Sequence, residues 1–401
     1  MSPERMIKVN MVVFSYFPAD TRVLREAQAL GRAGIAVDVI CLKDKKETEV
    51  ERFGNITAYR IMKGTAAKEN VFKYFILSSL FGLLAFFKLI RLSFKNKYSL
   101  IQAHNMPDFL VFVGLFHKFA GIPIILDLHD LTVELFISKC KDKNIIVLLP
   151  LVRFLEGISC KFADVLITTS SGFRDSLIER GVPPEKITLV LNSADNHVFE
   201  LPHKRTWKKI ETGPALLYHG TVAKRFGLHI AIDAVAELRE KMPETKLCIY
   251  GKYDPSYKAE LQAQIKAKGL ENNVTIGGFL GLSEIIEVIN RSDFGVVPYL
   301  SDPFMNLALS TKIFEYVSMR MPVVASRLQS ITSIFDDRSI MYFEPGNPND
   351  LSKKIIEMCG NPEESRKYSE YASQAYSNIS WPVMSERYIK TVNGLISGNA
   401  L

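Results

Sequence analysis

The chain has 401 residues, of which 47% are hydrophobic, and a formal net charge of +7. This length usually corresponds to two or more domains, and the hydrophobic content is sufficient for globular cores. The five cysteines are scattered and form no C-x-x-C pair, which argues against a disulfide framework or a zinc site. No apolar leader with a small-residue cleavage site precedes the first expected strand, so we expect no signal peptide and a cytoplasmic location.

The positive charge is concentrated in the first half of the chain. Residues 1–206 hold 28 Lys and Arg residues against 21 Asp and Glu residues, whereas the remainder holds 22 of each. Such an asymmetry is typical of proteins that bind a nucleic acid or an anionic membrane, and ordinary solvated surface charge produces it as well. Composition alone leaves these readings open.

In the first half, apolar strand patterns alternate with helix patterns. The strand pattern Ile7–Phe14 is followed by a helix pattern at Thr21–Ala33, for which Asp20 is a suitable N-cap and Gly34 a suitable stop. Short buried strands that alternate with helices predict a parallel sheet covered on both faces. Further strands are expected at Ile35–Leu42, Ser99–Ala103, Ile122–Asp127, Val165–Thr168 and Ile187–Val190.

Residues Phe72–Phe94 form an apolar helix pattern in a basic region. The uncharged core, Tyr74–Phe87, has 14 residues, fewer than the about 20 apolar residues that a membrane-spanning helix needs. Residues 60–97 contain eight basic residues and one acidic residue. The helix either packs entirely on the sheet or also lies on an anionic membrane surface. Three basic side chains are expected on one helix face: Lys88, Arg91 and Lys95.

The alternation restarts in the second half, after a polar and basic connector at 203–213 that we interpret as a domain linker. The strand patterns again alternate with helices, which predicts a second parallel sheet. The last segment, Trp381–Ile396, is an amphipathic helix pattern. The strands are expected at Ala215–His219, Lys246–Tyr250, Val274–Ile276, Phe294–Pro298 and Pro322–Ala325.

The segment Asn306–Ser326, NLALSTKIFEYVSMRMPVVAS, carries the strongest functional signal. It predicts a loop, a short helix and a buried strand, with Lys312 and Glu315 facing a cleft. Free backbone N–H groups at the start of a helix suit a diphosphate, and a carboxylate one turn later suits the hydroxyls of a ribose. The side chains expected in the core are Ile313, Phe314, Val317 and Met321.

This segment closely resembles the donor site of retaining glycosyltransferases of family 4, also called group 1, which have the GT-B fold. In that family two glutamates are separated by seven residues. Glu315 matches the second, which holds the ribose, whereas Leu307 occupies the first position. The resemblance implies an α/β chain with two Rossmann-like domains whose parallel sheets face each other across a cleft. The implied parts are an acceptor-binding domain at 1–202, a linker at 203–213, a nucleotide-sugar-binding domain at 214–376 and a helix at 377–401 that crosses back to the first domain.

The turn Tyr218–Gly227, YHGTVAKRFG, resembles the loop with which the family holds the donor diphosphate. Family members often have Arg directly after the glycine. Here Thr221 follows it, so the cation would be Lys224 or Arg225. Glycines at two other strand ends permit close approach of a base or ribose. The predicted donor-binding residues are Gly220, Thr221, Gly251, Gly278, Phe279, Leu280, Asn306, Leu307, Thr311 and Lys312.

The stretch Leu126–Leu135, LDLHDLTVEL, runs from a buried strand into His129. The resemblance implies that a histidine of this loop contacts the donor sugar. Together with HNMPDF at His104–Phe109, this stretch resembles a bacterial polysaccharide branch of the family. Asp20 is either a helix cap or an acceptor ligand. The residues expected on the acceptor side are Asp20, Arg22, His104, Asp130 and Glu134, and those expected in catalysis are His129, Lys224, Arg225 and Glu315.

The resemblance implies transfer of a sugar, with retention of configuration, from a nucleoside diphosphate sugar to an acceptor hydroxyl. A UDP-sugar is favoured over GDP-mannose, and a lipid-linked saccharide of bacterial envelope polysaccharide assembly is the expected acceptor. We expect no cofactor and no metal, because the chain has no D-x-D motif, and no nucleic acid partner. An anionic membrane surface, on the cytoplasmic face of the inner membrane, remains a possible partner. The alternatives are a nucleotide-sugar 2-epimerase of GT-B fold and a catalytically silent sugar-binding protein.

Overall fold

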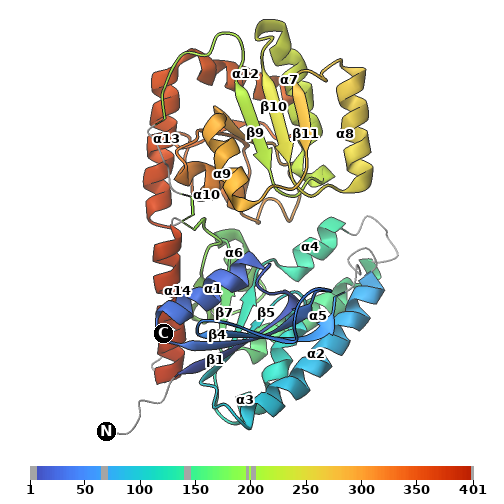
Figure 1. The fold of residues 1–401 in the computed structure, drawn as a ribbon, viewed down its shortest axis with the longest axis vertical. Coiled ribbons are helices and arrows are strands. Elements are labelled where there is room, and N and C mark those ends of the chain that lie inside the picture. The colour runs from blue at the N-terminus through green and yellow to red at the C-terminus, as the bar shows by residue number, and fades with distance from the viewer. Residues whose placement is uncertain (1–6, 65–70, 140–145, 196–197, 200–204, 399–401) are drawn as a thin grey trace. The chain divides into compact units, whose positions relative to one another are not determined.

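The computed structural model describes residues 7–64, 71–139, 146–195, 198–199 and 205–398 (Figure 1). The chain forms two compact units. The first comprises Met1–Leu191 and Met384–Leu401, and the second comprises Asn192–Val383. Each unit is built around its own sheet, which strands of one sequence half supply.

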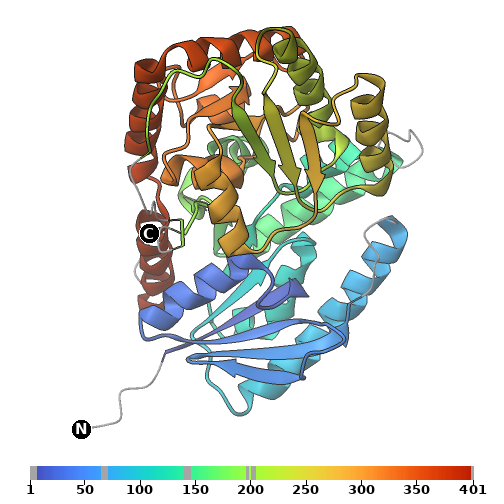
Figure 2. The same cartoon turned by 45° about the horizontal axis from the view of Figure 1, so that its top comes forward.

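The first unit contains a sheet of order β3-β4-β2-β1-β5-β6-β7-β8. Its central strands are buried along almost their whole length, because helices cover both faces of the sheet (Figures 1 and 2). All strands of this sheet that the sequence predicted pair in parallel, which confirms the parallel sheet. The antiparallel pair is formed by β3 and β4, which the sequence did not predict. The strands are β1 Lys8–Tyr16, β2 Ala36–Lys43, β3 Val50–Phe53, β4 Ile56–Lys63, β5 Leu100–His104, β6 Ile124–Leu128, β7 Val165–Thr168 and β8 Ile187–Leu189.

The helices of the first unit follow the strands in chain order. As expected, Asp20 caps the first helix: its Oδ1 accepts a hydrogen bond of 3.3 Å from the backbone N of Val23. Gly34 follows with φ 79°, a conformation that glycine adopts without strain. The helices are α1 Thr21–Arg32, α2 Val71–Ser93, η2 Asp108–Gly114, α3 Leu115–Phe119, α4 Thr132–Lys139, η3 Ile146–Leu148, α5 Leu149–Phe162, α6 Ser171–Glu179 and η4 Pro184–Lys186.

The second unit contains a sheet of order β11-β10-β9-β12-β13-β14, in which all pairs are parallel. Its strands are β9 Ala215–His219, β10 Lys246–Tyr250, β11 Val274–Gly277, β12 Phe294–Val297, β13 Val323–Ser326 and β14 Met341–Phe343. Its helices are η5 Lys224–Phe226, α7 Leu228–Lys241, α8 Pro255–Ala267, α9 Leu282–Arg291, α10 Thr311–Ser318, α11 Gln329–Thr332, α12 Pro348–Gly360 and α13 Pro362–Ser377.

The last helix, α14 (Trp381–Ser397), begins in the second unit and continues in the first. The hydroxyl of Tyr388 donates a hydrogen bond of 2.6 Å to Oε1 of Gln102 on β5, and Arg387 donates one of 3.0 Å to the carbonyl of Leu189. The helix therefore packs on the first unit, as the resemblance implied.

The boundary between the units does not lie in the predicted linker. The chain divides between Leu191 and Asn192, before 203–213. The guanidinium of Arg205 donates hydrogen bonds of 2.7 Å to the carbonyls of both Ser292 and Ile289. Because both carbonyls belong to the second unit, these hydrogen bonds fix this part of the connector to it. The prediction of a linker at 203–213 is therefore wrong.

Candidate active site

The second unit places the start of α10 beside the end of β9. Helix α10 begins after Ser310, whose side chain makes no capping hydrogen bond and instead shares one of 2.9 Å with the hydroxyl of Tyr299. The first N–H groups of a helix lack intrahelical partners, so this end attracts anions. The predicted core residues of the segment are all buried: Ile313, Phe314, Val317 and Met321.

Lys312, on the first turn of α10, is buried in an aromatic box. Its Nζ donates a hydrogen bond to the hydroxyl of Tyr299 and lies 4.8 Å from the ring centroids of Tyr218 and Tyr299 and 5.3 Å from that of Phe226. The sequence analysis expected Lys312 to face a cleft, but the side chain is only 8% exposed. Aromatic faces attract a cation, so the box fixes the position of the ammonium group.

The ammonium of Lys312 lies against the loop after β9. A Cβ atom placed on Gly220 would be 3.3 Å from Cε of Lys312 and 3.5 Å from its Nζ. Gly220 also has φ 117°, which disfavours any other residue. The backbone of this loop therefore lies close to the ammonium of Lys312.

Glu315 lies one turn further along α10 and near the same loop. Its Oε2 is 3.1 Å from Nε2 of His219, the last residue of β9, although the angles are not those of a hydrogen bond. The backbone N of His219 donates to the hydroxyl of Tyr316 at 3.2 Å, which fixes the end of the strand. The side chain of Glu315 is 21% exposed and thus accessible to a ligand.

The two cations predicted for the diphosphate have other partners. Nζ of Lys224 is 3.3 Å from Oε2 of Glu260, and both side chains are more than half exposed. The guanidinium of Arg225 lies 5.6 Å from the ring centroid of Phe304. The predicted roles of Lys224 and Arg225 remain predictions, whereas Lys312 is the cation that the structure places directly at Gly220.

The remaining predicted donor residues lie in neighbouring loops. A Cβ atom on Gly251 would come 1.7 Å from the carbonyl oxygen of Gly220, so only glycine fits this position. The backbone N of Gly251 also donates to the carbonyl of Gly278 at 3.0 Å, which joins three loops at one edge of the sheet. Phe279 is 68% exposed. Thr221 is exposed, and Leu280, Asn306, Leu307 and Thr311 are half-buried.

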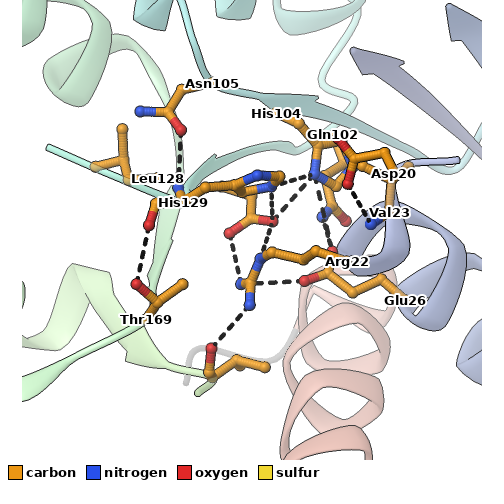
Figure 3. A network of polar contacts seen from close by, with 12 residues as sticks. Asp20, Arg22, Val23, Glu26, Gln102, His104, Asn105, Leu128, His129 and Thr169 are labelled. Carbon is orange, nitrogen blue, oxygen red and sulfur yellow. Dashed lines mark hydrogen bonds and ion pairs between the residues drawn. The ribbon is translucent and has the colours of Figure 1, made fainter. Parts of the chain in front are cut away.

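In the first unit, Arg22, His104 and His129 lie close together (Figure 3), and Asp127, near the end of β6, is their common partner. Arg22 binds this carboxylate with two hydrogen bonds, from Nε at 3.0 Å and from Nη2 at 2.7 Å. Oδ2 of Asp127 also lies 3.0 Å from Nδ1 of His104 and 2.9 Å from Nε2 of His129. Of the residues predicted for this unit, the structure thus brings together Arg22, His104 and His129.

Other buried groups extend the network on the side of α1. Oε1 of Glu26 is 3.1 Å from Nη2 of Arg22, and the side-chain amide of Gln102 donates to Oε2 of Glu26 at 2.7 Å. Gln102 in turn accepts the hydrogen bond from Tyr388 on α14. The sequence analysis missed these three residues, as well as Asp127. The available signals were the i,i+4 spacing of Arg22 and Glu26 and the place of Asp127 within LDLHDL.

The charges of this network shift the pKa values of its members in different directions. Burial disfavours the charged imidazolium of His129, but the negative charge of Asp127 and its hydrogen bond to the ring together outweigh burial and raise the His129 pKa. For His104, burial prevails and lowers the pKa. Burial would raise the pKa of Asp127, yet Arg22 and His129 hold it well below the usual range. Burial, reinforced by Asp127, raises the pKa of Glu26 to about 8.

The side chains of His104, Asp127 and His129 also offer one metal-ligating atom each, and these atoms lie within 4.8 Å of one another. However, the guanidinium of Arg22 holds both oxygens of Asp127, and this positive charge opposes a cation at the same carboxylate. Imidazole and carboxylate ligands do occur in metal sites. With Arg22 at the same carboxylate, however, these three residues fit a metal ion poorly.

Of the predicted acceptor-side carboxylates, those of Glu134 and Asp20 have partners inside the first unit. Glu134 is buried and pairs with Arg180 at 2.7 Å, and Glu156 lies 3.0 Å from the same guanidinium. Glu134 therefore fixes α4 near α6 rather than projecting toward an acceptor. The carbonyl of Asp130 accepts a hydrogen bond of 2.6 Å from the Asn105 side chain, and Asp20 serves as the cap of α1.

Two family models match consecutive parts of the chain. The model described as Glycosyltransferase Family 4 matches residues 19–197, and the model described as Glycosyl transferases group 1 matches residues 201–375. The chain belongs to the group 1, family 4 glycosyltransferases. It is therefore a glycosyltransferase, in agreement with the resemblance of the Asn306–Ser326 segment.

Similar curated proteins are also sugar transferases. The chain is 21% identical over 272 residues to an alpha-D-kanosaminyltransferase of Streptomyces kanamyceticus, covering 65% of this chain and 67% of the relative. It is 25% identical over 234 residues to a glycogen synthase of Mycobacterium tuberculosis, covering 57% of this chain and 54% of that relative. The chain thus spans little more than half the length of that glycogen synthase.

Solved structures confirm the GT-B fold. A sucrose-phosphate synthase of Thermosynechococcus elongatus matches with a TM-score of 0.76 and 16% identity, covering 98% of this chain and all of that one. Anabaena Alr3699/HepE in complex with UDP-glucose matches with a TM-score of 0.69 and 16% identity, covering 97% of this chain and 100% of the other. The two Rossmann-like units predicted from the sequence are therefore those of a GT-B glycosyltransferase.

Proposed function

We propose that this glycosyltransferase transfers a sugar from a nucleoside diphosphate sugar to an acceptor hydroxyl with retention of configuration, and that a UDP-sugar is preferred over GDP-mannose. The observation that supports the proposal is that Lys312 and Glu315 of α10 lie close to Gly220 and His219, at the carboxyl end of β9 in the second sheet. A similar fold has been solved with UDP-glucose bound, in Anabaena Alr3699/HepE, which supports a UDP-sugar donor.

In this proposal the donor diphosphate lies at the start of α10, against the backbone of Gly220. The ammonium of Lys312 supplies the positive charge that neutralises the leaving diphosphate as the bond to the sugar breaks. The helix N-terminus contributes in the same direction. Glu315, one turn later, accepts hydrogen bonds from the ribose hydroxyls, and Arg225 or Lys224 adds charge from the neighbouring loop.

The first unit contributes His129, which we propose contacts the donor sugar. Because Asp127 raises the His129 pKa, the imidazole retains a proton at a higher pH than a free histidine does. It can therefore donate a hydrogen bond to a sugar oxygen. Arg22, which binds the same Asp127, keeps that carboxylate ionised and in place. Arg22 and His104 thus act through Asp127 on the position of His129.

We further propose that the acceptor is a lipid-linked saccharide in bacterial envelope polysaccharide synthesis, that the enzyme works at the cytoplasmic face of the inner membrane, and that the reaction needs no metal ion. Bidentate occupation of Asp127 by Arg22 supports the last point. No feature of the described residues indicates a nucleic acid partner.

The proposal is tested by incubating the full chain with UDP-glucose, UDP-N-acetylglucosamine and GDP-mannose, each with and without a lipid-linked saccharide. Transfer that requires acceptor and retains the anomeric configuration supports the proposal. Conversion of the donor to its 2-epimer without acceptor would instead identify a nucleotide-sugar 2-epimerase. Donor binding without turnover under all conditions would identify a silent sugar-binding protein, an outcome relevant because Leu307 replaces the first glutamate of the family signature.

A further inference from the structure

Helix α2 has apolar side chains on both its faces. One face packs on the sheet and on η2: Phe81, Ala85 and Leu89 are fully buried. The opposite face is apolar but exposed, which is unusual for a helix of a water-soluble protein. Its members recur with helical periodicity, and their exposed fractions run from 39% to 73%: Phe72, Phe75, Ile76, Leu80, Leu83, Leu84 and Phe87.

Length and composition support a lipid environment for this helix. Among the residues that the structure describes, α2 is long and apolar enough to cross a membrane: Phe72–Ser93 has 22 residues, a mean hydropathy of 1.9 and only 28% of its most apolar window buried. The sequence analysis judged the uncharged core too short, and the helix is longer than that core. Because one face packs on β4 and η2, the helix lies on the first unit rather than crossing a bilayer.

Exposed apolar side chains also occur on neighbouring elements of the same unit. The ring of Phe86 on α2 lies 5.2 Å from that of Phe116 on α3, and η2 packs against both α2 and α5. These contacts join the helices into one layer (Figure 1). We call the following set the apolar surface: the seven α2 residues above together with Phe94, Phe116, Phe119, Val147, Leu148, Leu151 and Phe154. Most of the exposed large apolar side chains among the described residues belong to it.

The charged residues around the apolar surface are predominantly basic. No Asp or Glu occurs from Val71 to Pro107. Arg91, Lys95 and Lys97 at the end of α2 and Arg153 on α5 are exposed. Lys88, in contrast, lies 4.9 Å from the ring centroid of Tyr59, so the expected row of Lys88, Arg91 and Lys95 is not one open face.

We propose that the apolar surface inserts into the headgroup and upper acyl region of an anionic lipid bilayer, with α2 lying in the membrane plane. Exposed Phe and Leu side chains supply the apolar contact, and the surrounding Arg and Lys side chains meet lipid phosphates. A second copy of the chain is a poorer occupant, because a two-fold interface would bring the same basic residues together. The inference concerns membrane attachment and does not depend on the transfer reaction.

The surface is tested by sedimentation of the full chain with two kinds of vesicle, pure phosphatidylcholine and equal parts of phosphatidylcholine and phosphatidylglycerol. The variant L83Q/F87Q removes two apolar anchors that are 55% and 59% exposed. The matched control is V50Q/L282Q, which changes two apolar side chains of similar exposure, 53% and 48%, outside the surface. The variant R91Q/K95Q removes two exposed positive charges and tests whether they contribute to binding of anionic vesicles.

We expect L83Q/F87Q to weaken binding to both kinds of vesicle on the order of tenfold or more, and V50Q/L282Q to bind as the parent does. R91Q/K95Q should lose mainly the preference for anionic vesicles and show a weaker salt dependence. Binding of UDP by each variant, measured in parallel, shows that the fold is intact.

Four results would overturn the proposal: a parent that sediments with neither kind of vesicle, an L83Q/F87Q variant that binds as the parent does, loss of binding in V50Q/L282Q to the same extent, or a parent that is a dimer in solution and becomes a monomer in L83Q/F87Q. The last result would assign the surface to a second copy of the chain.

Discussion

Lys312 provides the sharpest test of the proposed donor site. In the structure its ammonium lies against Gly220, where the diphosphate is expected, and its contacts are a phenol hydroxyl and aromatic rings. Lys312→Met shortens the side chain by one heavy atom but keeps an unbranched apolar chain between the rings while removing the charge. Hydrogen bonds to charged groups contribute about 1.5–3 kcal/mol each. We therefore expect the Kd for UDP to rise about tenfold to a hundredfold.

The substitution Lys312→Met should not lower the stability of the folded chain. Burial of the Lys312 ammonium costs free energy that the cation–π contacts offset only in part, each contributing about 0.5–2 kcal/mol. Replacement of a buried charge by a well-packed apolar side chain is often neutral or stabilising. The thermal midpoint without ligand should therefore stay the same or rise in Lys312→Met, so weaker UDP binding cannot be attributed to unfolding.

Isothermal titration with UDP, UMP and uridine measures the effect. Lys312→Met should weaken binding of UDP more than that of UMP, and should leave that of uridine unchanged. The matched control is Lys367→Met, because Lys367 is exposed and lies 3.5 Å from Glu364 on α13, outside the proposed donor site; we expect a change of less than about threefold for an exposed pair of this kind. Equal UDP affinity of Lys312→Met and the parent would refute the placement of the diphosphate at Gly220.

Three further predictions concern the ribose, the metal and the buried carboxyl group. Glu315→Ala should weaken binding of UDP and of uridine alike, by about 1.5–3 kcal/mol per lost hydrogen bond; a variant that retains full uridine affinity contradicts the ribose assignment. Turnover should persist in excess chelator, and loss of activity that manganese or magnesium restores would disprove metal independence. Glu26 has a pKa of about 8 in the folded chain, above its ordinary value of 4.5, so the folded state binds more protons than the unfolded state between these values. The free energy of unfolding should accordingly fall as pH rises from about 4.5 to about 8, by up to about 1.4 kcal/mol per pH unit from this group, and Glu26→Gln should flatten that slope in chemical denaturation; an unchanged slope would show that Glu26 is ionised throughout.

Much of the fold could be predicted because its central strands are short apolar runs. β7, β9 and β10 have the bounds that the sequence indicated, and most other predicted strands differ by one or two residues at their ends. The strands β3, β4 and β14 were missed, and of these β3 and β14 lie at sheet edges. VERF of β3 carries two charges and is mostly exposed, so its sequence resembles that of a loop, and only pairing with β4 makes it a strand.

The sites could be predicted only as far as local sequence defines them. Helical spacing predicted that Lys312 and Glu315 face a cleft. In the structure both lie near the loop after β9, but Lys312 is buried in an aromatic box whose rings, Tyr218, Phe226 and Tyr299, come from different elements. No local pattern indicates that these three rings meet. The same holds for Asp127, whose partners belong to α1, β5 and the loop after β6.

The path of α14 has a consequence for biosynthesis. The first unit is completed by Met384–Leu401, and the 192 residues Asn192–Val383 lie between its two parts. Synthesis proceeds from the N-terminus, so the ribosome makes the whole second unit before the first can bury Gln102 beneath Tyr388. A chain that stops before Met384 therefore leaves the Arg22–Asp127 network open to water on one side. Premature termination near the end of the message thus damages the half of the protein that was made first.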